Sequence, residues 1–145
     1  MTIYDISAPQ TLDADITLPA SKSISNRALV IHALSGGSTL PDNLSDCDDT
    51  RVVMAALKDM PSVIDVQAAG TAMRFMTAYL AVTPGEHTIT GTERMCHRPI
   101  GLLVNALRMM GADISYLGEE GFPPLHIRGH RLPGGKLEVP GNISS

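Results

Sequence analysis

The stretch from residue 62 to residue 90, SVIDVQAAGTAMRFMTAYLAVTPGEHTIT, decides the fold class. Its first six residues predict a short strand. Residues 70–82 then carry apolar side chains at helical spacing, namely Ala72, Phe75, Met76, Tyr79 and Leu80. Pro84 and Gly85 mark a turn, and the alternating HTIT that follows predicts a second strand. A strand, a helix and another strand in succession predict a mixed α/β (α+β) layered structure, not a bundle or a sandwich.

The same alternation continues on both sides of this stretch. On its N-terminal side, residues 23–34 predict a helix, and the acidic run SDCDD at residues 45–49 is typical of the first turn of a second helix. On its C-terminal side, Pro99 is a favoured first helical residue and Gly111 a favoured stop. Further strands are expected at residues 16–19, 112–117, 124–129 and 136–141.

Composition excludes several classes of protein. The 145 residues are 43% hydrophobic and 18% charged, which is ordinary globular usage and argues against disorder. A net charge of −4 and only 3% aromatic residues give no support for nucleic-acid binding. No apolar run approaches a membrane span, and residues 1–10 lack the apolar core of a signal peptide. We therefore expect a cytoplasmic protein with no nucleic-acid or membrane partner.

No residue pattern predicts a metal or an organic cofactor. Cys47 and Cys96 are too far apart for a metal-binding pair and are expected to be reduced. None of the histidines has metal-ligand spacing, since His126 and His130 are separated by turn residues.

Small polar residues and cations occur where helices are expected to begin. Lys22 lies between two serines, with Arg27 about one helical turn beyond Ser23. Gly70 and Arg74 repeat this spacing in the next unit of the chain. Because the first N–H groups of a helix lack partners and carry partial positive charge, such positions attract anions.

Two further junctions fit the same pattern. Arg98 precedes the helix expected at Pro99, and Ser144 and Ser145 are plausible caps of a helix not reached by residue 145. Capping serines with surface cations explain each junction singly. Taken together at one edge of an α/β structure, they predict a site for a small ligand with more than one anionic group.

Four strings carry a resemblance to a known family. They are LPASKSISNRAL (18–29), LSDCDDTRVVMAAL (44–57), AAGTAMRFMTA (68–78) and GTERMCHRPIGLLVNALRMMGADI (91–114). In this order they resemble the bacterial 5-enolpyruvylshikimate 3-phosphate synthases, also called 3-phosphoshikimate 1-carboxyvinyltransferases. These transferases of the shikimate pathway, which leads to chorismate and the aromatic amino acids, move the enolpyruvyl group of phosphoenolpyruvate to the 5-hydroxyl of shikimate 3-phosphate. They use no cofactor.

The resemblance implies an incomplete copy of the family's fold. The family builds an inside-out α/β barrel from βαβαββ units, three in each of two domains. Residues 1–20 would belong with the second domain, and residues 21–145 would be part of the first, ending at the start of a further helix. This chain would then be an N-terminal fragment whose partner is the remaining C-terminal part of the same enzyme.

The resemblance also implies residue roles. The phosphoenolpyruvate-binding residues would be Lys22, Gly70 and Arg98, with Lys22 as the catalytic proton carrier. The residues that bind shikimate 3-phosphate would be Ser23, Arg27, Ser144 and Ser145. The family's acidic general acid/base residues lie beyond the matched part, so we expect no turnover from residues 1–145.

One departure and two alternatives remain. Ala68 stands where the family usually has an asparagine, which removes a side-chain amide near phosphoenolpyruvate. A UDP-N-acetylglucosamine enolpyruvyl transferase would have a reactive cysteine where this chain has Glu93, and an asparagine in place of Ser23. A non-catalytic anion-binding module is the other alternative.

Overall fold

A four-stranded sheet forms one layer of the computed structural model, which describes residues 3–5, 7, 11 and 13–139. The strands are β1 (Val63–Asp65), β2 (Gly85–Thr90), β3 (Asp113–Tyr116) and β4 (Leu125–Gly129), in the spatial order β1-β2-β4-β3. β1 and β2 are parallel, with Ile64 opposite Ile89, whereas β4 is antiparallel to both β2 and β3.

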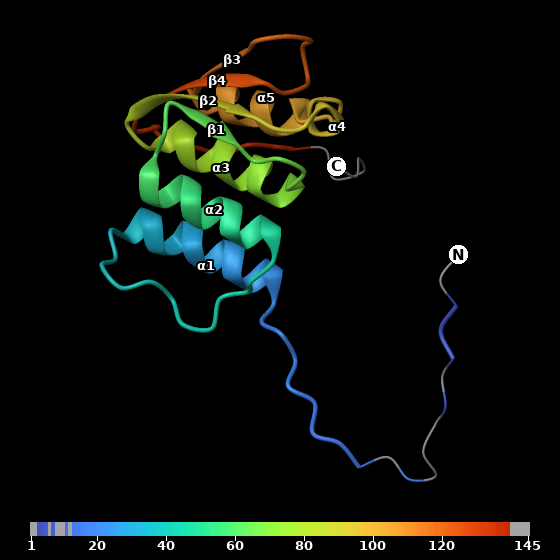
Figure 1. Ribbon diagram of the computed structural model, residues 1–145. Helices are drawn as coiled ribbons and strands as arrows, with labels where there is room; N and C mark the ends of the chain where they lie inside the picture. The colour runs from blue at the N-terminus through green and yellow to red at the C-terminus, as the bar shows by residue number, and fades with distance from the viewer. Residues whose placement is uncertain (1–2, 6, 8–10, 12, 140–145) are drawn as a thin grey trace.

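The helices complete one βαβαββ unit and add a second layer. α3 (Gly70–Val82) connects β1 to β2, and α4 (Glu93–Cys96) and α5 (Gly101–Met109) connect β2 to β3. α1 (Lys22–Ser35) and α2 (Asp48–Asp59) precede the unit and stack on α3, on the side away from the sheet (Figure 1). The mixed α/β prediction is confirmed.

α3 is buried on more than one face because it lies between the sheet and the α1–α2 pair. The expected stripe is buried at Ala72, Met76, Tyr79 and Leu80, but Phe75 is only half-buried. Further residues that the periodicity did not select are also buried, namely Met73, Thr77 and Ala81. The core therefore runs through this helix, from Leu29 and Val53 on one side to Ile89 and Ile127 on the other.

Two expected strands do not form over the residues that the structure describes, and one expected helix begins later than predicted. Residues 16–19 form no strand, and Ile16 and Leu18 are both 80% exposed. Residues 136–139 also form no strand, and 140–141 lie outside the described residues. A strand is stable only when its N–H and C=O groups pair with a neighbour, and no described residue pairs with either segment.

The helix expected at Pro99 begins later, at Gly101. The N–H group of Ile100 donates to the carbonyl of Gly121 at 2.8 Å, and Ile100, with φ −129° and ψ 0°, does not adopt the helical conformation. The sequence pattern did not predict α4, whose cap Thr92 accepts a hydrogen bond from the N–H of Met95 at 3.3 Å. No helix in the described residues is long and apolar enough to cross a membrane.

Two methionines provide a matched test of the core. Met76 on α3 is fully buried, whereas Met109 on α5 is 73% exposed. We expect Met76→Ala to lower the free energy of unfolding by about 2–5 kcal/mol, because it leaves a cavity in the core. Met109→Ala should change it by less than about 0.5 kcal/mol. Urea unfolding monitored by circular dichroism measures both, and equal losses would contradict this description of the core.

Candidate anion-binding site

The N-terminal ends of α1, α2 and α3 lie at one end of the molecule (Figure 1). The loop at residues 36–47 and strand β1 each carry the chain back before the next helix begins, so the three helices run in the same direction. Their unpartnered N–H groups therefore lie side by side and favour an anion at this end.

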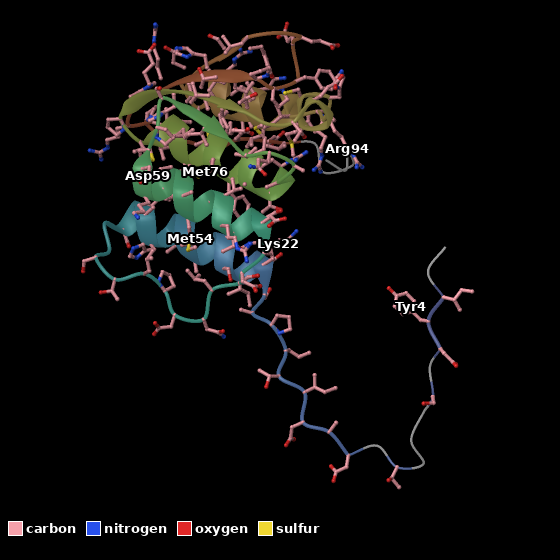
Figure 2. The ribbon with its side chains drawn as sticks, viewed as in Figure 1. Tyr4, Lys22, Met54, Asp59, Met76 and Arg94 are labelled. Atoms are coloured by element: carbon pink, nitrogen blue, oxygen red, sulfur yellow. The ribbon has the colours of Figure 1, made fainter. Side chains whose placement is uncertain are left out.

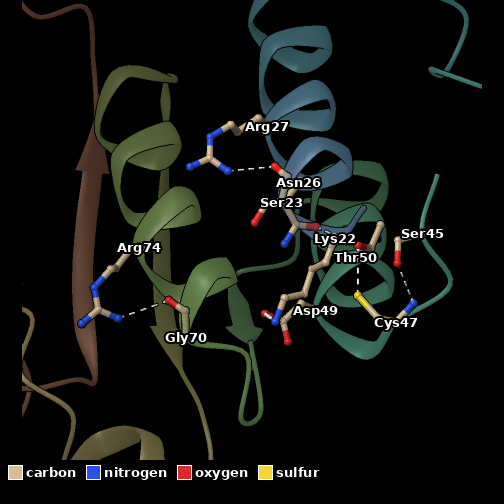
Figure 3. A network of polar contacts seen from close by, with 10 residues as sticks. All are labelled: Lys22, Ser23, Asn26, Arg27, Ser45, Cys47, Asp49, Thr50, Gly70 and Arg74. Atoms are coloured by element: carbon tan, nitrogen blue, oxygen red, sulfur yellow. Dashed lines mark hydrogen bonds and ion pairs between the residues drawn. The ribbon is translucent and has the colours of Figure 1, made fainter. Parts of the chain in front are cut away.

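Lys22, at the N-terminal end of α1, forms an ion pair with the N-terminal end of α2. The preceding Ser21 caps α1, since its side chain accepts a hydrogen bond from the N–H of Ile24 at 3.4 Å. Nζ of the half-exposed Lys22 lies 3.4 Å from Oδ1 of Asp49 in the first turn of α2 (Figure 3). An exposed ion pair is worth about 1 kcal/mol or less, so a ligand phosphate can compete with Asp49 for this lysine.

The side chain of Arg27 on α1 contacts α3. Its guanidinium donates from Nη1 to the carbonyl oxygen of Ser23 at 2.9 Å. Its Cζ atom also lies 5.4 Å from the centre of the Phe75 ring on α3. This cation–π contact holds the guanidinium between α1 and α3. Ser23 itself is exposed beside it.

Arg98 lies directly on the backbone of Gly70. A Cβ atom at residue 70 would collide with Nη1 of Arg98 and would lie 2.8 Å from its Cζ atom. Arg74, one turn along α3, donates to the carbonyl oxygens of Gly70 at 3.3 Å and of Pro99 at 3.1 Å. Burial and the nearby charge of Arg98 lower the pKa of Arg74. Glycine at residue 70 is therefore what allows a second guanidinium to approach this helix end.

A buried polar network supports the α1 and α2 ends. Thr50 donates from its hydroxyl to Oδ1 of the fully buried Asn26 at 2.9 Å, and both residues are labelled in Figure 3. The N–H of Ser45 donates to the Ser25 hydroxyl at 2.9 Å. Cys47, the cap residue of α2, lies beside Thr50 with Sγ 3.3 Å from its hydroxyl oxygen. Hydrogen bonds with Ser45 and Thr50 lower the pKa of the Cys47 thiol. Both cysteines are free thiols in the structure.

The structure thus brings together three of the four predicted junctions. They are the start of α1, the start of α3 and the Arg98 segment before α5. Ser144 and Ser145 lie outside the described residues. Among the described residues, Lys22 has a carboxylate partner within 4.0 Å, whereas Arg27, Arg74 and Arg98 have none.

The sequence does not indicate Asp49 as a partner of Lys22, because the acidic run at residues 45–49 predicts only the start of a helix. The contact depends on how α1 packs against α2. Within the described residues, no three His, Cys, Asp or Glu side chains lie close enough to hold a metal ion. The arrangement suits an anionic ligand, because its charged side chains are cations next to helix N-termini.

Comparisons with known proteins agree with one another. The family model described as EPSP synthase (3-phosphoshikimate 1-carboxyvinyltransferase) matches residues 6–63 and 59–145. A 3-phosphoshikimate 1-carboxyvinyltransferase of Bacteroides fragilis is 63% identical over 142 residues, which cover 98% of this chain and 35% of that protein. Another, from Shewanella halifaxensis, is 42% identical over 156 residues, covering 90% of this chain and 37% of that protein.

A solved structure has the same fold. The EPSP synthase from Acinetobacter baumannii superimposes with a TM-score of 0.74 at 24% sequence identity, over 90% of this chain and 35% of that one. The mixed α/β unit described above is therefore the fold found in that enzyme. The chain spans 35% of the length of the Bacteroides fragilis relative.

The contact between Gly70 and Arg98 can be tested by a single methyl group. We expect Gly70→Ala to displace the Arg98 guanidinium, since the added Cβ collides with it. Stability should change by less than about 1 kcal/mol, because the colliding atoms are the end of a flexible side chain. Nuclear magnetic resonance (NMR) of the Arg98 Nε–Hε group and thermal unfolding measure the two effects. Gly118→Ala is the control, because nothing lies within 4 Å of a Cβ there. An unmoved Arg98 signal would disprove the contact.

Cys47 should be the more reactive thiol. Its lowered pKa leaves more thiolate at neutral pH, and thiolate is the form that reacts with iodoacetamide. The labelling rate should fall as the pH drops through this lowered pKa. Cys96→Ser isolates Cys47 and Cys47→Ser isolates Cys96, which is also half-buried. Mass spectrometry of the two variants between about pH 6 and pH 9 gives the comparison, and faster labelling of Cys96 at neutral pH would contradict the prediction.

Proposed function

The chain belongs to the EPSP synthase family, and from this we propose that it forms part of the substrate site of a 3-phosphoshikimate 1-carboxyvinyltransferase. The observation that supports the proposal most directly is the gathering of Lys22, Arg27 and Arg98 around three helix N-termini. Both expected substrates are small phosphorylated anions, and such a site stabilises them through N–H groups and charged donors together.

Shikimate 3-phosphate is assigned to the α1 end. Ser23 offers an exposed hydroxyl, and Arg27 offers a planar fork held in place by Phe75. Ser144 and Ser145 would add two hydroxyl donors to the same phosphate. Shikimate lacks this phosphate, so the donors that hold the phosphate lose their partner when shikimate binds.

Phosphoenolpyruvate is assigned to the space between Lys22 and Arg98. Gly70 allows close approach to the first N–H groups of α3. On binding, Lys22 would exchange its contact with Asp49 for a contact with the ligand. Lys22 is also the residue that we propose to carry a proton during the reaction.

The transfer needs three proton movements, one at the 5-hydroxyl and two at C3 of phosphoenolpyruvate. The 5-hydroxyl of shikimate 3-phosphate adds to C2 of phosphoenolpyruvate and loses its proton, while C3 gains one. Loss of a proton from C3 then expels inorganic phosphate and restores the double bond. We place the carboxylates that share this work in the part of the enzyme that the 35% coverage leaves out. Residues 1–20 are assigned to the second domain of such an enzyme, and the enzyme to the cytoplasm.

Calorimetry on residues 1–145 tests the proposal. We expect binding of shikimate 3-phosphate and at least about tenfold weaker binding of shikimate, since charge-assisted hydrogen bonds to the phosphate are lost. Arg27→Gln should weaken binding of shikimate 3-phosphate by about tenfold or more, because a bidentate donor is removed. Arg51→Gln is the control, since Arg51 lies on α2 and pairs with Asp48.

The other outcomes identify the competing functions. Equal binding of shikimate and its phosphate would contradict the proposal. Preference for UDP-N-acetylglucosamine would favour the related transferase, and binding of any phosphate without preference would favour an anion-binding module. We expect no turnover from residues 1–145, and measurable synthase activity would overturn the assignment of essential groups to the rest of the enzyme.

A further inference from the structure

A hollow of about 480 Å³ lies beside the N-terminal end of α3. Its lining comes from two segments, the loop before α3 and the α4 region, and consists of Ala68, Thr92, Arg94, Met95 and Arg98. Arg98 is the residue that also lies on Gly70. Arg94 belongs to neither the junctions nor the substrate residues discussed above, yet it reaches the same end of the molecule as Lys22 (Figure 2).

The position of Arg94 is fixed by the backbone of α4. Thr92 donates from its N–H to the carbonyl of Gln67 at 3.0 Å, which attaches α4 to the loop before α3. The N–H of Cys96 donates to the carbonyl of Thr92 at 3.0 Å, and the N–H of Arg98 donates to that of Met95 at 3.0 Å. The buried Met95 side chain anchors this turn in the core. Arg94 and Arg98 are therefore held at the rim of one hollow by the same short turn.

The two guanidinium groups lack local charge compensation. Among the described residues, neither Arg94 nor Arg98 has a carboxylate within 4.0 Å. Arg51, Arg108 and Arg128, by contrast, each have one. Two like charges that share a hollow repel each other, and an anion bound between them adds a favourable interaction with each. The small side chain of Ala68 leaves room for such an anion.

We propose that Arg94 is a second phosphate-binding arginine, which holds the phosphate group of a small ligand in this hollow together with Arg98. The chemistry is shared by phosphoenolpyruvate and by inorganic phosphate. The choice of phosphoenolpyruvate as the ligand rests on the proposed function, whereas binding of phosphate itself does not. Arg94 binds the ligand and takes no part in proton transfer.

NMR titration of residues 1–145 tests this assignment. Phosphoenolpyruvate and inorganic phosphate are titrated separately, and the Nε–Hε signals of Arg94 and Arg98 are followed. We expect both signals to shift in a saturable manner. Arg94→Gln should raise the dissociation constant of each ligand by about tenfold, because a charged donor is removed. Arg94→Lys keeps the charge without the fork and should lose less.

Arg51→Gln is the matched control. It removes the same charge from an exposed arginine outside the hollow and should change the dissociation constant by less than about twofold at physiological salt. Thermal unfolding of each variant checks that the fold is retained, which is expected because Arg94 is exposed. If Arg94→Gln binds both ligands as the unmodified chain does, or if the unmodified chain binds neither, the proposal is wrong.

The test separates this proposal from the proposed function. If Arg94→Gln has no effect while shikimate 3-phosphate still binds better than shikimate, only the role of Arg94 is lost. If Arg94→Gln weakens phosphate binding but shikimate 3-phosphate is not preferred, the phosphate site is retained and the proposed function is lost. Preference for inorganic phosphate over phosphoenolpyruvate identifies the hollow as a site for the released phosphate and still requires Arg94.

Discussion

The burial of α3 between the sheet and the α1–α2 pair is the constraint on which the rest of the structure depends. One face of this helix packs on the strands, and another receives the two preceding helices. Apolar side chains such as Met73 and Met76 fill both contacts. Because α3 is held on two sides, its first turn at Gly70 has a fixed position, and the candidate site is built around that turn.

The same packing explains how an acidic chain forms a cationic site. The net charge of −4 describes the whole sequence, but parallel helices bring their positive ends and their nearby cations to one end of the molecule. Arg27 is directed by Phe75, and Arg98 by the absence of a side chain at Gly70. Asp49 is the carboxylate placed beside Lys22, with its Oδ1 atom 3.4 Å from Nζ.

Local patterns predicted the elements whose stability is local, and failed where a distant partner decides. The helices at residues 23–34 and 70–82 were predicted nearly to their ends, since helical hydrogen bonds and apolar spacing lie within one segment. The strand expected at 16–19 was wrong, and so was the described part, 136–139, of the strand expected at 136–141, because strand pairing depends on a neighbour that alternation cannot reveal. The start of α5 was displaced by a hydrogen bond from Ile100 to Gly121, which is remote in sequence.

The sequence by itself determined the α/β class, the family resemblance and the residues at each helix junction, because these depend on residue type and short spacing. The tertiary structure decided which junctions meet, and it added the pairing of Lys22 with Asp49 and the contact of Arg98 with Gly70. It also placed Arg94 at the same hollow as Arg98. The physical reason is that charge acts through distance in space, and helix packing sets those distances between residues far apart in the chain.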